Sequence, residues 1–418
     1  MGRGAGRQRA RLARGGTGVV VSVSVSTAER PDIDLLDPAL YAQNPHEVWS
    51  WMRANEPVYR DRANGLWAVT RHADVMDVER RSTVFVSGRG YRAIWESREC
   101  NMIAQDDPRH RQQRMLVQPE LTRAGVSKRE VDIASLVADL VARCLAKGSF
   151  EVVSELAGQL PARLTARLLG FEESSWEQVK SWSERLMRTD MRDRDETTMA
   201  EFIDANREFL AAMAPIMADR ATCPADDLMS IWAHARIGGE PLPPEAIFHE
   251  VGLFIAGGAE TTRTAISHGL RVFCDHPEQW DAMAADPTLV PGAVEEVLRW
   301  VTPLNNFFRT VASPDRIGDQ PVAEGDRVIM LYPSANRDET VFNRPFEFDI
   351  RRSPNPHLSF GFGTHLCVGA NLARSVLVAL FRELSARAHD LVPVTEPDVE
   401  ANIFARAVKS FHLRLTPR

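Results

Sequence analysis

The stretch Phe360-Gly361-Phe362-Gly363-Thr364-His365-Leu366-Cys367-Val368-Gly369 places one cysteine at the end of a glycine-rich loop. Directly after it, the run from Ala370 to His389 has the apolar spacing of a long amphipathic helix. A thiolate at Cys367 would lie near the positive end of that helix dipole, which favours the ionised form by up to about 2 kcal/mol. Glycines permit positive φ and the close approach of a large flat group, and loop N–H groups can tune a ligating sulfur. The stretch therefore predicts that Cys367 ligates a metal.

Two other interpretations of this loop are open at this point. Cys367 could be a buried, inert cysteine that follows an ordinary loop. The glycines could instead cradle a phosphate, but residues 361–366 lack the third glycine of a dinucleotide-binding fingerprint. The metal-ligand interpretation explains the cysteine and the glycines together.

The spacing Phe-x-x-Gly-x-x-x-Cys-x-Gly of residues 360–369 resembles the haem-binding signature of the cytochrome P450 family, and His365 is typical of its soluble bacterial members. The resemblance extends from about Asp32 to the C-terminus. It implies haem b (iron protoporphyrin IX) with Cys367 as the axial ligand of the iron. It also implies a mainly α fold with a small β subdomain, in which the haem lies between a long central helix and the cysteine loop.

The helical and extended patterns lead to the same fold class without the motif. Segments with helical period are 45–54, 70–80, 107–119, 128–147, 153–169, 174–188 and 198–219. Strand-like segments are short, and we expect a small sheet contributed by both ends of the chain: 58–60, 66–69, 308–311, 327–331 and 410–415. No linker or internal repeat divides the 418 residues. We therefore expect one domain over residues 29–418.

The first 28 residues have a different composition, with five arginines, many glycines and no acid. Their apolar part is interrupted by serines, so we expect a disordered basic leader or an extended start of the reading frame rather than a signal peptide. Without these five charges the net charge of −7 becomes −12, which argues against nucleic acid as a partner. No segment reaches membrane-spanning length, so we expect no membrane anchor. The cysteines are odd in number and far apart in the sequence, which indicates neither disulfides nor a zinc site: Cys100, Cys144, Cys223, Cys274 and Cys367. We expect a cytoplasmic monomer.

Prolines bound a run of about 32 residues between Pro244 and Pro277, which as a helix would span roughly 48 Å. Its centre contains Gly257-Gly258-Ala259-Glu260-Thr261. Two glycines cost a helix interior about 1 kcal/mol each, which indicates a close approach or a local opening of the helix. Thr261 could bond back to a carbonyl one turn earlier or offer its hydroxyl to a ligand.

Two interpretations of Glu260 and Thr261 are open. Small residues could serve helix packing, with Glu260 pointing to solvent. The family resemblance implies instead an oxygen-binding groove in which Glu260 relays protons from solvent and Thr261 hydrogen-bonds the reacting oxygen. That pair favours a monooxygenase supplied with electrons by a reductase.

Two further groups of residues match the family pattern. Glu296 and Arg299, three residues apart on one helix face, could be an ordinary surface pair, but the resemblance implies a buried pair with Arg352 as its third member. Haem propionates need fixed cations and hydrogen-bond donors. The resemblance assigns this role to four residues, each of which could also be a solvated surface group: His110, Arg114, Arg309 and His365.

The resemblance implies a monooxygenase that inserts one oxygen atom of O2 into a C–H bond. Electrons from NAD(P)H would arrive through a ferredoxin reductase and a ferredoxin, because little chain follows Cys367. Basic residues that could attract an acidic ferredoxin, or be ordinary solvated charges, are Arg109, Arg111, Arg123, Lys128 and Arg374. A haem-thiolate sensor or carrier without turnover is the alternative from another class, and the Glu260–Thr261 pair argues against it.

Segments expected to line the substrate pocket are mainly apolar and aromatic, which implies a lipophilic molecule: 85–105, 186–199, 304–307 and 403–404. Residues 51–58, 304–308 and 355–365 are similar to those of actinobacterial cholesterol side-chain hydroxylases. A sterol or 3-oxo-steroid hydroxylated on its alkyl tail is therefore the expected substrate. A polyketide or terpenoid natural product is the alternative.

Overall fold

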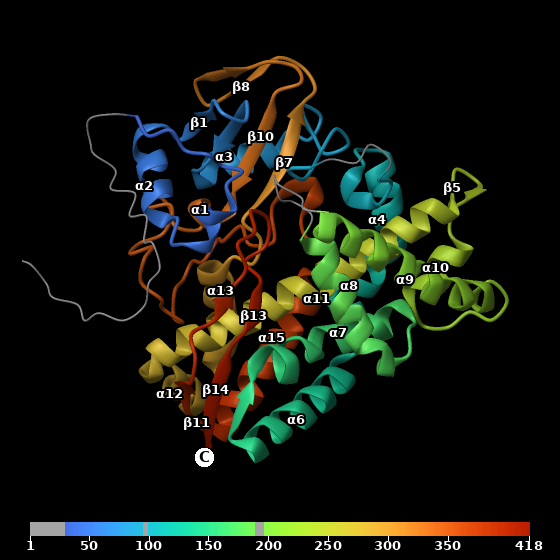
Figure 1. Cartoon of the computed structure of the whole chain (residues 1–418), viewed down its shortest axis with the longest axis vertical. Coiled ribbons are helices and arrows are strands. Elements are labelled where there is room, and N and C mark those ends of the chain that lie inside the picture. The colour runs from blue at the N-terminus through green and yellow to red at the C-terminus, as the bar shows by residue number, and fades with distance from the viewer. Residues whose placement is uncertain (1–29, 95–98, 189–195) are drawn as a thin grey trace, which may run out of the picture. The chain divides into compact units, whose positions relative to one another are not determined.

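Helix α11 (Pro244–Asp275) crosses the centre of the computed structural model, and helices from both halves of the chain pack against it (Figure 1). The structure describes residues 30–94, 99–188 and 196–418. Within this part, residues 33–418 form one compact unit. The prediction of a basic leader over residues 1–28 lies outside the described residues. No helix of the described part is both long enough and apolar enough to cross a membrane.

Prolines lie at both ends of α11, as the sequence predicted. Pro244 occupies its first turn, where the missing N–H is not needed, and Pro277 begins the next helix. The helix has 32 residues, and more than half of its side chains are buried on several sides. Such a helix is stabilised by packing along its whole length rather than on one face.

The helices around α11 come from several predicted segments. They bury two large apolar clusters, one between α6, α13 and α15 and one between α7, α8 and α9. The long predicted helix 153–169 is interrupted, because a π-helical turn (Val153–Ala157) precedes α7 at Gly158. The surrounding helices are α4 (Arg109–Leu121), α5 (Arg123–Ser127), α6 (Glu130–Lys147), α7 (Gln159–Leu169), α8 (Trp176–Met187), α9 (Glu196–Arg220), α10 (Leu228–His234), α12 (Pro277–Ala285), α13 (Val290–Val301) and α15 (Ala370–Arg387).

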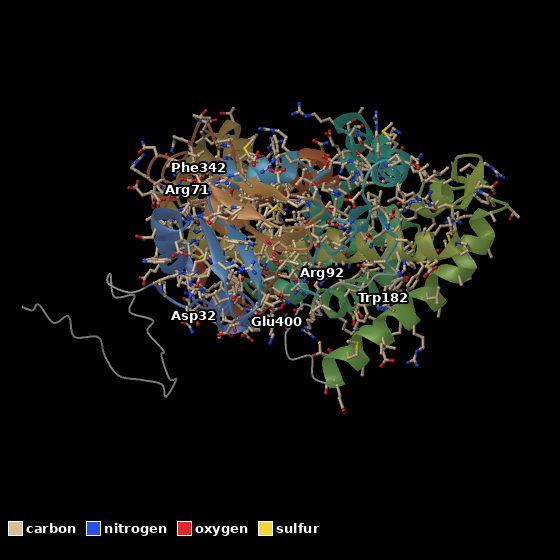
Figure 2. All side chains as sticks on the ribbon, turned by 90° about the horizontal axis from the view of Figure 1, so that it is seen from above. Asp32, Arg71, Arg92, Trp182, Phe342 and Glu400 are labelled. Atoms are coloured by element: carbon tan, nitrogen blue, oxygen red, sulfur yellow. The ribbon has the colours of Figure 1, made fainter. Side chains whose placement is uncertain are left out.

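Trp182 of α8 illustrates how this helical layer is held together (Figure 2). Its indole N–H donates to Glu208 of α9 at 2.9 Å, and its ring lies against Phe171 and Phe209. A buried aromatic side chain with a bonded polar edge contributes apolar area without an unsatisfied donor. Helices α8 and α9 therefore form a stable wall beside α11.

A five-stranded sheet lies at the opposite end of the compact unit from α6 and β14 (Figure 1). Its order is β1-β2-β10-β7-β3, with β2 and β10 parallel and the other pairs antiparallel. Three short helices pack beside it: α2 (His46–Asn55), α3 (His72–Arg80) and α14 (Tyr332–Ala335). The strands are β1 (Val58–Asp61), β2 (Leu66–Val69), β3 (Phe85–Val86), β7 (Asn306–Val311) and β10 (Arg327–Leu331).

The C-terminal strand does not join this sheet, contrary to the expectation of a single sheet built from both ends of the chain. It forms a separate antiparallel sheet of order β11-β14-β4 with β11 (Ala388–Pro393), β14 (His412–Pro417) and β4 (Ser149–Glu151). Apolar side chains of β14 alternate inward onto α6 and α15. The remaining elements are short: α1 (Pro38–Ala42), β5 (Arg236–Ile237), β6 (Glu240–Pro241), β8 (Asp315–Ile317), β9 (Gln320–Val322), β12 (Asp398–Val399) and β13 (Val408–Ser410).

Candidate active site

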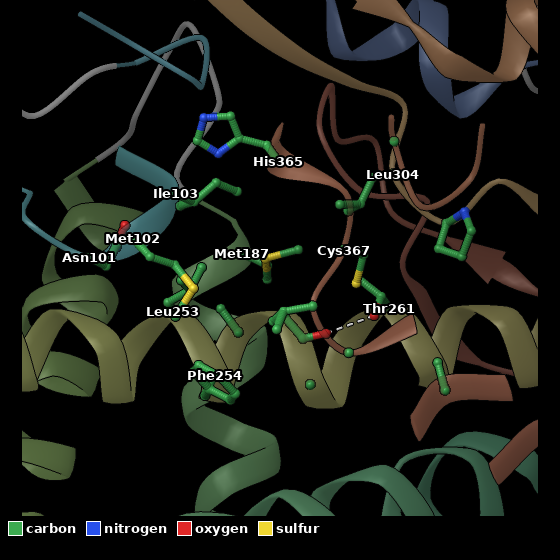
Figure 3. Close-up of a pocket in the computed structure, with 18 of the residues that line it drawn as sticks. Asn101, Met102, Ile103, Met187, Leu253, Phe254, Thr261, Leu304, His365 and Cys367 are labelled. Atoms are coloured by element: carbon green, nitrogen blue, oxygen red, sulfur yellow. Dashed lines mark hydrogen bonds between the residues drawn. The ribbon is translucent and has the colours of Figure 1, made fainter. Parts of the chain in front are cut away.

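A cavity of about 530 Å³ lies between the middle of α11 and the glycine-rich loop. In Figure 3, Cys367 lies over the part of α11 that carries Thr261, while Leu253 and Met102 lie farther toward the N-terminal end of the helix. The wall between these ends is mainly apolar. A concave apolar site with a few polar groups is the usual form of a small-molecule site.

The loop before Cys367 depends on its glycines. Gly361 and Gly363 have φ of +69° and +67°, which disfavours other residues. At Gly363 a Cβ would lie 2.5 Å from the backbone oxygen of Glu79, so only glycine lets the loop pack against α3. Cys367 N donates to Phe360 O at 2.8 Å and closes the loop, leaving Sγ accessible from the cavity.

The surroundings of Cys367 act on the pKa of its thiol in opposite directions. Burial among protein atoms raises the pKa of Cys367, and it outweighs the opposing effects of the Gly369 N–H, Arg114 and Arg374. The loop alone therefore favours a neutral thiol. A bound metal cation would deprotonate such a thiol directly.

The four predicted cradle residues come together at this end of the cavity. His110 and Arg114 lie one turn apart on α4, and the His110 ring centroid is 4.2 Å from that of His365. Arg114 Nη1 donates to Leu366 O at 2.7 Å, which ties α4 to the cysteine loop. Arg309 projects from β7 and is 3% exposed.

The cradle contains two arginines, Arg114 and Arg309, and a histidine nitrogen that is left without a partner in the described part of the chain. His365 Nδ1 is buried and has no hydrogen-bond partner among the described residues. Burial together with neighbouring Arg309, His110 and Arg114 pushes the pKa of His365 well below its ordinary value. One carboxylate, Glu79, lies 3.7 Å from Arg309. Two further carboxylates on a large flat group beside Cys367, such as haem propionates, fit this arrangement.

The adjacent glycines at 257 and 258 of α11 have different structural roles. A Cβ at Gly258 would lie 2.7 Å from Thr165 Oγ1 of α7, so this glycine permits close helix packing. A Cβ at Gly257 would meet nothing within 4 Å, because the residue faces the cavity. Thr261 Oγ1 donates to Gly257 O at 2.8 Å and also lines the cavity. The threonine therefore bonds back to the helix at the place where a ligand would meet it.

Glu260 lies on a different side of α11 from Thr261. It is 2% exposed, it does not line the cavity, and its Oε1 accepts from Arg263 Nη2 at 2.6 Å. Arg263 also pairs with Glu184 of α8. Burial raises the pKa of Glu260, although Arg263 opposes this. The solvent-facing interpretation of Glu260 is excluded, and its carboxylate belongs to a buried ion-pair cluster.

Glu296, Arg299 and Arg352 form a buried network. Both guanidinium–carboxylate bonds of Glu296 and Arg299 are 2.7 Å long, and both side chains are fully buried. Arg352 Nε lies 3.1 Å from Glu296 Oε2. Asn355, just before the cysteine loop, donates to the same oxygen at 3.1 Å. The network joins α13 to the segment that leads into the loop.

The predicted pocket segments contribute much of the cavity wall, including Met102, Ile103, Met187, Leu304 and Phe404. Residues 95–98 of the predicted segment 85–105 and residues 189–195 of the predicted segment 186–199 lie outside the described residues. Sequence reasoning missed α7 and the first half of α11, among them Leu164, Phe248, His249 and Leu253. The i, i+4 series that leads back from Thr261 could have identified the residues of α11.

The basic residues predicted near the cysteine lie on or beside α4, α5 and α15. Arg374 bonds Glu295 at 2.7 Å and Lys128 Nζ lies 3.6 Å from a Glu120 oxygen, so their charges are partly compensated. Arg111 and Arg123 are exposed, and no ion pair of either is found within the described part of the chain. His357, which precedes the cysteine loop, also pairs with Glu295, at 3.0 Å.

Comparison with known proteins finds matches to the cytochrome P450 family in sequence and in structure. The cytochrome P450 family model matches residues 179–384. A steroid C26-monooxygenase from Mycobacterium tuberculosis is 35% identical over 398 residues, covering 93% of this chain and 98% of that protein. A linalool 8-monooxygenase from Pseudomonas putida is 30% identical, covering 93% and 100%. The structure of a Mycobacterium marinum cytochrome P450 in complex with pseudoionone has a TM-score of 0.85 at 31% identity, covering 93% and 100%.

Fold, cavity and relatives together define a haem-dependent monooxygenase, as the sequence predicted. The chain belongs to the cytochrome P450 family. Members of this family bind haem b, and bacterial members receive electrons from redox-partner proteins and bind lipophilic substrates.

Proposed function

We propose that Cys367 is the axial ligand of the haem iron and that His110, Arg114, Arg309 and His365 hold the propionates. The cavity-facing sulfur and the unpartnered His365 Nδ1 support this assignment. Haem bound here supplies dioxygen activation and insertion of one oxygen atom into a C–H bond. Replacement of Cys367 by serine should remove the thiolate-type spectrum of the ferrous carbon monoxide complex. Retention of that spectrum would contradict the assignment.

Thr261 has the proposed role of holding a proton at the reacting end of the cavity. Its hydroxyl donates to Gly257 O in the helix, and rotation about one bond would present it to a bound ligand. Glu260 can deliver a proton to the same place only if its carboxyl leaves Arg263. We propose that this pairing is broken and re-formed during turnover. Glu184 would keep Arg263 paired during that exchange.

The proposed substrate is a sterol or 3-oxo-steroid, hydroxylated on its alkyl side chain. The observation that carries this proposal is 35% identity to a steroid C26-monooxygenase over nearly the full length of both chains. The mainly apolar cavity, with its elongated wall along α11, is consistent with such a ligand. A terpenoid substrate is the second candidate, because the linalool 8-monooxygenase and the pseudoionone complex are also similar to this chain.

One experiment compares these candidates. We propose that residues 29–418 form a single catalytic domain, that a ferredoxin is the electron donor and that the protein is located in the cytoplasm. In the assay, the purified protein is supplied with a ferredoxin, a ferredoxin reductase and NADH. Cholest-4-en-3-one, linalool and a macrolide are offered separately, and products are identified by mass spectrometry. Side-chain-hydroxylated sterol as the main product supports the proposal, whereas turnover of linalool alone would overturn it.

A further inference from the structure

A second polar site lies where His249 of α11 meets Cys100. The backbone N–H of Cys100 lies 3.3 Å from His249 Nδ1, and Cys100 Sγ lies 3.0 Å from the same nitrogen. A backbone N–H can only donate, so Nδ1 accepts and carries no proton. In the neutral imidazole the proton is then on Nε2. His249 lines the cavity and therefore offers it one hydrogen-bond donor.

The chemistry of this pair excludes two other roles. Burial lowers the pKa of His249 and raises the pKa of Cys100 to about 11, so both groups are neutral at pH 7 and do not form an activated nucleophile. Within the described residues, no group of three or more His, Cys, Asp or Glu side chains could hold a metal. A ligand-facing hydrogen-bond donor is the role that remains.

The site is fixed in place by a third residue, which is fully buried. Glu250, next to His249, is fully buried and its Oε1 accepts from Met102 N at 2.9 Å and from Gln113 Nε2 at 3.2 Å. Gln113 Nε2 also donates to Cys100 O at 2.8 Å. These bonds hold residues 100–102 against α11 and α4. The imidazole therefore has its orientation before any ligand binds.

The distance between His249 and the reacting end suits an elongated molecule. His249, Leu253, Gly257 and Thr261 follow one another at i, i+4 spacing, and all four line the cavity. Twelve residues of helix separate the first from the last, which is about 18 Å. Between these two ends the series presents only a leucine side chain and a glycine. A ligand that spans them has an apolar body.

Other polar groups near this end are already bonded. Glu99 Oε1 accepts from the Tyr91 hydroxyl at 2.8 Å, and Asn206 Nδ2 donates to Phe202 O at 2.8 Å. No hydrogen bond of His249 Nε2 is found in the described part of the chain. His249 Nε2 is thus an unbonded donor at this end of the cavity, among the described residues.

We propose that His249 binds the oxygen-bearing end of the substrate, donating from Nε2 to a carbonyl or hydroxyl oxygen about 18 Å along α11 from Thr261. An extended sterol has about this length between the oxygen at C3 and the end of its side chain. The donor suits a 3-oxo group, which can only accept. This inference rests on the proposed steroid function. The inference adds that His249 binds the end of the substrate that is remote from Thr261. This contact determines which side-chain carbon of the substrate reaches Thr261.

The test is an optical titration of the ferric holoenzyme with cholest-4-en-3-one and with cholest-4-ene, which lacks the oxygen. We expect the wild type to bind the ketone about five- to tenfold more tightly, the contribution of one hydrogen bond. His249→Ala should lose this preference while keeping its affinity for cholest-4-ene. His249→Gln, which retains an N–H donor at similar reach, should restore part of it. His389→Ala, which removes an exposed histidine outside the cavity, should leave the preference unchanged.

The outcomes separate this inference from the function on which it rests. A preserved ketone preference in His249→Ala, or equal wild-type affinity for both sterols, overturns the role of His249 and leaves a steroid hydroxylase possible. Binding of neither sterol by the wild type overturns both. In a turnover assay, His249→Ala should also spread hydroxylation over several side-chain carbons, and unchanged product distribution would count against the inference.

Discussion

Glu260 and Arg263 pair at 2.6 Å on the buried side of α11, while Thr261, next to Glu260, lines the cavity. Adjacent residues of a helix point about 100° apart, so an acid and an alcohol in sequence do not share a face. The carboxylate is part of a cluster with Glu184 and the hydroxyl is part of the site. Substitutions at the two positions should therefore have different effects.

Replacement of Thr261 by alanine should lower the coupling of electron consumption to product formation. The methyl group cannot hold a proton at the reacting end of the cavity, and we expect product formed per NADH to fall by a factor of about ten, within the range of general acid–base effects. Thr261→Ser keeps the hydroxyl and should retain most of the coupling. NADH oxidation and product are measured together, and equal coupling in Thr261→Ala would contradict the role of the hydroxyl.

Replacement of Glu260 by glutamine should lower stability, in addition to removing its proposed proton delivery. It leaves buried Arg263 with Glu184 alone, and we expect a loss of about 1–3 kcal/mol of unfolding free energy, below the usual cost of breaking an isolated buried pair. The matched control is Glu347→Gln, which removes an exposed pair with Arg344 at the same i, i+3 spacing and should cost less than about 1 kcal/mol. Urea unfolding measures both. Equal losses would show that burial of Glu260 has no energetic consequence.

The sequence predicted those parts of the structure that depend on local rules. The prolines at 244 and 277 set the ends of α11, and the glycines at 361 and 363 identified the cysteine loop. The family resemblance predicted a proton-relay role for Glu260, but local patterns did not indicate its contacts, which depend on an arginine one turn later and on Glu184 of α8. His249 was missed because its partner, Cys100, is distant in the sequence. Pairings between remote segments leave no periodic signal.

The buried carboxyl of Glu250 predicts a pH dependence of stability. Burial raises its pKa in the folded protein to about 8 from 4.5, so between these values the folded chain holds a proton that the unfolded chain releases. The contribution of Glu250 to the free energy of unfolding is fully present below pH 4.5. It is lost as the pH rises through 8, by up to about 1.4 kcal/mol per pH unit. In Glu250→Gln the fall in melting temperature from pH 5 to 8 should be smaller. Glu245→Gln, an exposed control on the same helix, should keep the wild-type dependence of melting temperature on pH. The same dependence in all three proteins would contradict a raised pKa of Glu250.

Exposed arginines on α4 and α5 predict salt-dependent recognition of an acidic ferredoxin. In Arg111→Ala/Arg123→Ala we expect the KM for ferredoxin to rise about three- to tenfold at low ionic strength, with the difference shrinking as salt is added. The matched control is Arg207→Ala, which removes an exposed arginine on α9. Reduction of the haem is followed at several ferredoxin concentrations. A similar rise in the control would mean that net charge, rather than this surface, determines the interaction.

The most direct test of the steroid hydroxylase proposal is optical titration of the purified ferric protein with cholest-4-en-3-one, beside a fatty acid and a macrolide. A ligand that reaches the end of the cavity at Cys367 and Thr261 would change the spin state of haem bound there. We predict a saturable shift from low spin to high spin with the sterol and weaker shifts with the other two. A normal haem spectrum that the sterol leaves unchanged, with saturation by the fatty acid or the macrolide, would contradict the steroid assignment.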